Sequence, residues 1–375
     1  MIRRSLGGAV AALLAIELLD ELVFGAREAA WPSVRDDLSL SYVEIGLLLT
    51  VPSLVSLAVE PVLGVVAVTW RRRALVLGGG LAFAGSLALA AGAPSVWVLL
   101  AAFAVLYPAS GAFVSLSQAS LMDLQPERRE HNMARWTLAG AVGAVVGPLL
   151  VPLAGLAGFG WRGLFAGFAV LALVLVLLAR RVPDTRDGDR PRVRDALRVM
   201  ARREVVRWLF LVELSDLLLD VLLAFLALYF VDEVGASVAT AGLAVAVWTG
   251  AGLVGSAAAI PLLRRLDGLR YLRGSAAVTA ALFVAFLLVP QTAGKLALVA
   301  AIAVVNAGWY PVLQARLYGA LGDASGLALT VGALFPLNAL LPLGIAALAE
   351  RWGLGVALWP LLAAPAALLL LVPRR

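Results

Sequence analysis

Three carboxylates lie inside one of the most apolar stretches of the sequence. Glu17, Asp20 and Glu21 fall within AIELLDELVF, residues 15–24. Because successive residues of an α-helix turn by about 100°, these side chains would share a stripe about 120° wide with Arg27 and Glu28. Burial and neighbouring like charges favour the protonated form of a carboxylate. Residues in this pattern can carry a proton or bind a cation.

A second acidic cluster lies in the other half of the chain. LVELSDLLLD, residues 211–220, contains Glu213, Asp216 and Asp220, which would also share one helical stripe. A shift of 196 residues places IELLD (16–20) on VELSD (212–216). The same shift aligns Gly46 with Gly242, and Gln118-Ala119 with Gln314-Ala315. Agreement in three spans at one offset indicates an internal repeat, and many secondary transporters bind their cargo between two such repeats.

Two interpretations of the carboxylates are open. In the functional one they carry protons or bind cations in a wet cavity, since a charge at mid-membrane costs about 2.5–3.5 kcal/mol on insertion scales. In the structural one they pair with Arg27, cap polar contacts or hold the first and seventh spans together. Glu17 and Asp20 have counterparts in the second half, whereas Glu21 falls opposite Leu217. The first two are therefore the better functional candidates.

Further polar side chains lie at mid-depth in two other spans, and we expect them to line a substrate cavity. Arginine is scarce at this depth, so the cavity should be net negative, which favours cationic or neutral amphipathic cargo. These residues are Tyr107, Ser115 and Gln118 in the fourth span, and Asn306, Trp309, Tyr310 and Gln314 in the tenth.

The composition is typical of a polytopic membrane protein. The chain has 375 residues, of which 62% are hydrophobic and 14% charged. It has no cysteine and a single histidine, His131, which excludes disulfides, thiolate metal sites and a Ser-His-Asp triad within one chain. No nucleophile–base pair or metal set accompanies the carboxylates, so we expect a transporter without a cofactor rather than an enzyme. The arginine-rich, alanine-rich usage favours a GC-rich bacterial gene.

Apolar segments long enough to cross a bilayer recur twelve times. A charged linker at 181–204 divides them into two sets of six, so the expected units are residues 1–180 and 205–375. The linker is either an amphipathic helix on the membrane surface or a solvated connection. The expected spans are 5–30, 41–68, 74–92, 95–121, 133–157, 162–180, 205–231, 236–263, 274–290, 294–318, 325–348 and 353–372.

The arginine distribution fixes the orientation. If the N-terminus is cytoplasmic, 25 of the 30 basic residues lie on the cytoplasmic side. This places both termini in the cytoplasm and the protein in the inner membrane. The net charge of +6 is then a topology determinant, so we expect no nucleic-acid partner. The five exceptions are Arg27, Arg35, Arg162, Lys295 and Arg351.

Two stretches resemble motifs of the major facilitator superfamily. GVVAVTWRRRALVLGGG (64–80) resembles the family's signature after the second span: Gly64 and the basic residues Arg71, Arg72 and Arg73 match, whereas the aspartate position reads Val68. In the family this aspartate helps to latch the cytoplasmic gate, so the resemblance does not imply a standard latch here. LMDLQPERREHNMARW (121–136) is similar to the family's loop between the fourth and fifth spans.

A third stretch, GAVGAVVGP (140–148), is similar to the glycine-rich motif of the superfamily's drug/proton antiporter branches. Gly140, Gly143, Gly147 and Pro148 match it, and we expect these residues to allow close helix packing. Glu60, near the cytoplasmic end of the second span, is either a gate contact for a loop arginine or an interfacial carboxylate. The resemblance covers nearly the whole chain. It implies an all-α membrane protein with 12 transmembrane helices in two pseudo-symmetric six-helix bundles.

The sequence therefore predicts a secondary active transporter working by alternating access. We expect proton-coupled export of a small cationic or neutral amphipathic molecule by a monomer surrounded by membrane lipid. Alternatives are lipid or lysolipid transport, proton-coupled import, a membrane enzyme, or a non-transporting sensor. The carboxylates on the first and seventh spans are the expected coupling residues.

Overall fold

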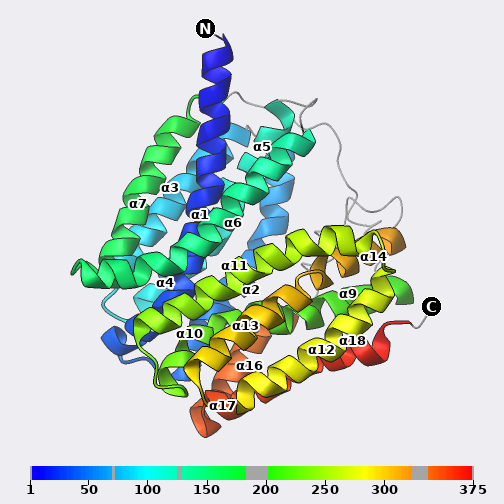
Figure 1. The fold of residues 1–375 in the computed structure, drawn as a ribbon. Coiled ribbons are helices and arrows are strands. Elements are labelled where there is room, and N and C mark those ends of the chain that lie inside the picture. Colours follow the sequence, from blue (N-terminus) through cyan, green and yellow to red (C-terminus); the bar gives the residue numbers. More distant parts are fainter. Residues whose placement is uncertain (1, 70–71, 125–128, 183–201, 322–336, 374–375) are drawn as a thin grey trace. The chain divides into compact units, whose positions relative to one another are not determined.

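The computed structural model describes residues 2–69, 72–124, 129–182, 202–321 and 337–373 (Figure 1). These residues are almost wholly helical and contain no β-strand. The chain separates into two compact units, Met1–Arg190 and Pro191–Arg375. Most of the 181–204 linker lies outside the described residues, and with it the amphipathic helix considered there.

The first unit consists of six long helical segments, one of which changes its helical type. Segment four is formed by α4, a π-helical turn η1 and α5, where a single α-helix is expected. The bounds are α1 (Ile2–Leu38), α2 (Tyr42–Thr69), α3 (Arg72–Ala91), α4 (Val96–Ser110), η1 (Gly111–Ser115), α5 (Leu116–Leu124), α6 (Arg129–Leu156) and α7 (Gly160–Ala179).

The second unit repeats this pattern with more interruptions. Its first segment contains the π-helical turn η3, its fourth is broken between α13 and α14, and its last has three parts. The bounds are α9 (Arg203–Asp216), η3 (Leu217–Val221), α10 (Leu222–Asp232), α11 (Val238–Leu263), α12 (Gly268–Leu288), α13 (Thr292–Asn306), α14 (Trp309–Leu321), α16 (Leu337–Trp352), α17 (Leu354–Ala357), the 3₁₀ turn η5 (Trp359–Leu362) and α18 (Ala363–Leu371).

Ten helical segments among the described residues are long and apolar enough to cross a membrane. Two of the twelve expected spans fall outside this set for different reasons. Every stretch of α1 long enough to span carries at least three charged residues, including the acidic stripe. The helix α16 has only 16 described residues and follows a part of the chain outside the described ranges.

Polar contacts of short range set where helices begin. Ser41 and Glu44 form a reciprocal cap at the start of α2: the Ser41 amide donates to Glu44 Oε2 at 2.8 Å, and the Glu44 amide donates to Ser41 Oγ at 3.2 Å. The carboxylate of Asp267 accepts from the amides of Leu269 and Arg270 at the start of α12. These caps fix the turns that precede two of the spans.

The end of α1 is tied to two other helices of the first unit. Asp37 Oδ2 accepts from Arg162 Nε at 2.8 Å and from the indole of Trp161 at 3.1 Å. Arg162 also donates to the carbonyl oxygen of Ala91, the last residue of α3, at 3.0 Å. The 37-residue helix α1 is thus anchored beyond the expected span end at residue 30.

The glycine-rich face of α6 packs directly against α1 (Figure 1). A β-carbon added at Gly143 would lie 2.6 Å from the carbonyl oxygen of Leu18, and one at Gly147 would lie 2.5 Å from that of Leu22. In return, Pro148 lies against Gly25 of α1, where an added β-carbon would be 2.9 Å from its Cδ. Close approach of two backbones through small residues is a common packing mode of membrane helices.

We expect Gly147→Ala to lower the free energy of unfolding by about 1–3 kcal/mol, because its new methyl group meets backbone atoms that cannot rotate away. Gly155→Ala in the same helix is the matched control, since an added β-carbon there meets nothing within 4 Å. Thermal unfolding of both variants in detergent micelles provides the comparison. Equal melting temperatures for the two variants would contradict the close α1–α6 contact.

Candidate functional site

The acidic stripe of α1 faces the point where segment four becomes irregular. Ser110, the last residue of α4, donates its hydroxyl to Asp20 Oδ1 at 2.7 Å. The π-helical turn η1 begins at the next residue. π-Helical turns within α-helices are often found at functional sites. Asp20 is thus held by a side chain located directly beside a helix irregularity.

The other two carboxylates of the stripe lie against α6. Glu17 is 9% exposed, and a β-carbon added at Gly140 would lie 2.5 Å from its Oε1 atom. Glu21 contacts the same helix through its Cβ, which lies 2.7 Å from the β-carbon position of Gly143. The glycines expected for packing therefore border the acidic stripe itself.

The stripe has no ion-pair partner in the part of the chain that the structure describes. Among the described residues, neither arginine nor lysine forms an ion pair with Glu17, Asp20 or Glu21. Arg27, the partner considered in the structural interpretation, pairs with Glu28 instead. The stripe can therefore attract protons or cations without first displacing an internal counter-ion.

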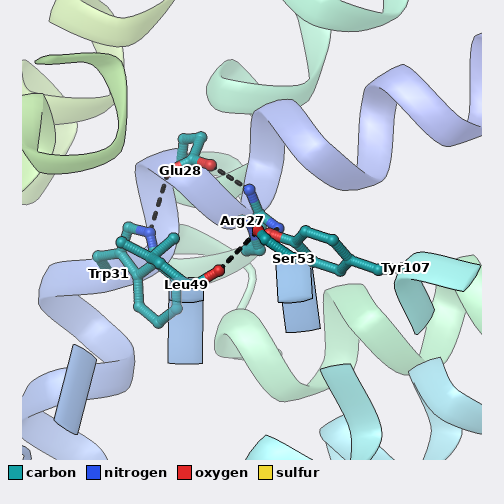
Figure 2. Close-up of polar contacts among 6 residues, drawn as sticks. All are labelled: Arg27, Glu28, Trp31, Leu49, Ser53 and Tyr107. Atoms are coloured by element: carbon teal, nitrogen blue, oxygen red, sulfur yellow. Dashed lines mark hydrogen bonds and ion pairs between the residues drawn. The ribbon is translucent and has the colours of Figure 1, made fainter. Parts of the chain in front are cut away.

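Arg27 is the centre of a separate buried cluster (Figure 2). It donates to Glu28 Oε1 and to the hydroxyl of Tyr107, and Trp31 Nε1 donates to Glu28 Oε2 at 3.0 Å. The guanidinium also lies over the rings of Phe24 and Tyr107, 4.7 and 5.1 Å from their centroids. Tyr107, expected in the substrate cavity, is thus bound to Arg27.

The acidic cluster of the second unit has a different local geometry. Glu213 is buried in α9, whereas Asp220 lies in η3 and is exposed. A π-helical turn has more residues per turn than an α-helix, so the 100° spacing that grouped Asp220 with Glu213 does not apply across η3. Asp216 ends α9, and its side chain lies outside the described part of the structure.

The fourth segment of the second unit, called segment ten here, consists of α13 and α14 and is broken between Asn306 and Trp309. Two polar side chains of α12 hold this break. The hydroxyl of Tyr271 donates to the carbonyl oxygen of Val305 at 3.0 Å and accepts from the amide of Gly308 at 3.2 Å. Trp309 is fully buried and donates its indole to Ser275 Oγ at 2.8 Å. Trp309, expected to line the cavity, therefore packs on α12.

The remaining cavity candidates are distributed around these irregular points. Asn306 is 1% exposed, and its Nδ2 atom has no hydrogen-bond partner among the described residues. Tyr310 is 49% exposed, and Gln314 is partly exposed in α14. In the first unit, Gln118 donates to Sδ of Met133 at 3.6 Å, and Ser115 is exposed.

The basic cluster after α2 has a partner that the motif comparison does not indicate. Arg72 is buried and donates to Asp123 Oδ2, near the end of α5, at 2.6 Å. The pair joins α3 to α5 although the family's aspartate position reads Val68. Arg73 is exposed. Glu60 and Gly64 lie in α2, where the structure describes only their backbone, and Arg71 lies outside the described residues.

Lys295, the one lysine of the chain, forms a polar cluster that sequence reasoning missed. It is 5% exposed and donates to the hydroxyl of Tyr229 at 2.7 Å and to the carbonyl oxygen of Phe286 at 2.6 Å. Its ammonium group also lies 4.9 Å from the centroids of both rings. The only signal in the sequence was the isolation of this lysine among arginines. The contacts join α13 to α10 and α12.

Chemically, the α1 stripe is suited to reversible binding of protons or small cations. The described residues contain no group of three or more His, Cys, Asp or Glu side chains arranged to hold a metal ion. Two carboxylates of the α1 stripe, Glu17 and Glu21, lie against glycines of α6, and the third, Asp20, accepts a hydrogen bond from Ser110. This arrangement provides acceptors for positive charge.

Comparisons with known proteins agree on the fold. The family model described as Major Facilitator Superfamily matches residues 13–337. A crystal structure of a bacterial homologue of the human lysosomal transporter Spinster has a TM-score of 0.74 at 15% identity, covering 98% of this chain and 95% of that one. The nucleoside transporter NupG has a TM-score of 0.77 at 14% identity, covering 97% of each chain. No curated protein matches the chain.

A third solved structure, a D-xylose-proton symporter, has a TM-score of 0.71 at 17% identity and covers 97% of this chain and 98% of that one. At sequence identities this low, the three matches show similarity of fold alone. Together with the ten apolar segments, it confirms the prediction of a multi-pass, all-α membrane protein.

The Arg27–Glu28 pair yields a prediction about stability. Glu28→Gln leaves a buried guanidinium without its counter-charge, so we expect a loss of about 3–5 kcal/mol in the free energy of unfolding. The double variant Arg27→Met/Glu28→Gln should recover part of that loss, because no uncompensated charge remains. The free energies of unfolding of Arg27→Met, Glu28→Gln and the double variant together give the coupling energy between the two side chains. Additive effects would show that the two side chains do not act as a pair.

Proposed function

The chain belongs to the major facilitator superfamily of secondary transporters, and we propose that it exports a cationic or neutral amphipathic compound in exchange for protons. The observation that carries this proposal is the acidic stripe of α1, which has no ion-pair partner among the described residues. Asp20, held by Ser110 beside η1, is the central coupling residue. Glu17 and Glu21 extend the stripe along α6.

The proposed exchange rests on competition for the same oxygen atoms. A carboxylate binds either a proton or a cationic cargo, so arrival of one favours release of the other. Alternating access would then let protons bind from one side of the membrane and cargo from the other. Because Arg27 is already neutralised by Glu28, the excess charge of this region is negative. This favours cationic cargo over carboxylates or phosphates.

The aromatic side chains beside the stripe fit the apolar part of such a cargo. Phe24 and Tyr107 lie edge to face with their ring centroids 5.4 Å apart. Tyr107 is partly exposed in α4. In the second unit, Asn306 and Gln314 supply neutral polar groups near the break of segment ten. We propose that these groups contact cargo during the cycle, with the second acidic cluster at Glu213 and Asp216 as the counterpart of the first.

Proteoliposomes with an imposed pH gradient test this proposal, with ethidium as a fluorescent cationic probe. We expect ethidium efflux to be accompanied by proton entry, and Asp20→Asn to reduce the coupled flux at least tenfold. The control is Asp36→Asn, which removes an exposed carboxylate from the same helix outside the stripe and should transport as the wild type does. Unchanged flux in Asp20→Asn would overturn the coupling role.

The direction of flux is read from the same assay. Movement of probe and protons in opposite directions is the expected result. Movement in the same direction would replace export by symport, the activity named for the D-xylose-proton symporter that shares this fold. Probe movement without proton flux would remove protons from the mechanism while keeping transport.

A further inference from the structure

We propose that a groove on the second unit binds an anionic phospholipid of the cytoplasmic leaflet, with one acyl chain in the groove and the phosphate at Arg270. The groove lies between α11, α12 and the end of α13, and has a volume of about 370 Å³. This volume is within the range of about 300–1,000 Å³ typical of ligand clefts. The site is separate from the acidic stripe and does not depend on the cargo.

The shape of the groove comes from small residues between larger apolar ones. Gly255 and Ala259 of α11 and Gly274 of α12 contribute little side-chain volume along its length. The larger residues that line it are exposed: Leu262 by 41% and Val278 by 50%. In a chain that spans a membrane, an acyl chain matches the chemistry of such an exposed apolar groove.

The cytoplasmic end of the groove carries positive charge that is available to a phosphate group. Arg270 lines the groove in the first turn of α12, and Arg264 and Arg265 are exposed at the end of α11. None of the three forms an ion pair among the described residues. The nearby carboxylate of Asp267 is occupied by the cap of α12 and by Arg316 at 3.6 Å. Arginines near an anionic leaflet attract its negatively charged lipids.

A second groove of similar size provides an internal comparison. It lies between α3 and α7 and has a volume of about 400 Å³. Only apolar residues line it, among them Gly85, Ala88 and Leu173. An acyl chain could enter either groove, but the arginine that reaches the α3–α7 groove, Arg162 at Ala91, is already paired with Asp37, whereas Arg270 lines the α11–α12 groove without an ion pair among the described residues. The difference in charge therefore predicts selectivity for anionic lipid at one of two otherwise similar surfaces.

The lipid would touch the residues that hold the break of segment ten. Tyr271 and Ser275 line the groove, and their hydroxyl groups bind Gly308 and Trp309 across the break. A β-carbon at Gly308 would lie 2.5 Å from the Tyr271 ring, so the two elements already fit closely. An acyl chain in the groove would press α12 toward this break and stabilise the second unit.

Native mass spectrometry and thermal unfolding of the full-length protein, with added phosphatidylglycerol or phosphatidylcholine, test the site. We expect preferential retention of phosphatidylglycerol and a rise in melting temperature that phosphatidylcholine does not reproduce. Gly274→Leu fills the groove, since an added β-carbon there meets nothing within 4 Å. It should abolish both effects. Arg270→Gln should remove the preference for phosphatidylglycerol.

Matched controls separate the site from general effects on folding. Gly85→Leu fills the groove between α3 and α7, and Arg135→Gln removes an exposed arginine of α6; both should leave the phosphatidylglycerol effect intact. Melting temperatures without lipid report whether each variant folds. Retention of phosphatidylglycerol by Gly274→Leu would overturn the groove, and equal binding of the two lipids would overturn the phosphate contact. Inorganic phosphate at millimolar concentration should give no shift, and a full shift with it would replace the lipid by a free anion.

Discussion

Three carboxylates of α1 that have no ion-pair partner among the described residues are the constraint on which the first unit depends. A charged side chain at mid-membrane costs about 2.5–3.5 kcal/mol on insertion scales, and α1 carries three ionisable carboxylates within five residues. The structure offsets part of this cost with the hydroxyl of Ser110 and with close packing against α6. Among the described residues no arginine or lysine forms an ion pair with these carboxylates, and Arg27 is bound to Glu28 instead. The stripe thus keeps a capacity to bind positive charge.

One irregular point in each unit occurs at a related place, whereas η3 falls on a regular part of α1. Shifted by the same 196 residues that align the acidic clusters, Ser110 falls on Asn306. The π-helical turn η1 begins directly after Ser110, and the break of segment ten begins directly after Asn306. Irregular backbone at membrane depth is tolerated only where protein or a water-lined cavity satisfies it. Tyr271 meets this requirement in the second unit by bonding to both sides of the break.

The features that depend on local sequence were predictable. Apolar length predicted the ten segments that are long and apolar enough to cross a membrane, and the 196-residue offset predicted the repeat, which is consistent with the family match. The turns η1 and η3 were not predictable, because a π-helical turn depends on the tertiary packing that compensates its weaker hydrogen bonds. Their effect is concrete: the ideal 100° spacing places Asp220 with Glu213, and η3 interrupts that spacing. The predicted coupling and cavity residues remain predictions.

Long-range pairs were beyond the sequence for a different reason. Arg72 and Asp123 are 51 residues apart, and Lys295 and Tyr229 are 66 apart. From the neighbouring residues in the sequence alone, each partner of these pairs could equally have been placed in solvent or at the membrane surface. Only the packing of helices brings such groups together, and a single sequence contains no measure of that packing.

The distribution of charge separates the scaffold from the site. Arg27, Arg72 and Lys295 are buried, and each has a polar partner at hydrogen-bond distance. Those contacts join α1 to α4, α3 to α5, and α13 to α10, so their loss would weaken packing between helices. The carboxylates of α1 differ, since their contacts are a hydroxyl group and glycines rather than cations. Among the described residues these buried cations have polar partners, whereas the acidic stripe of α1 has no ion-pair partner, which supports its proposed role in binding exchangeable protons.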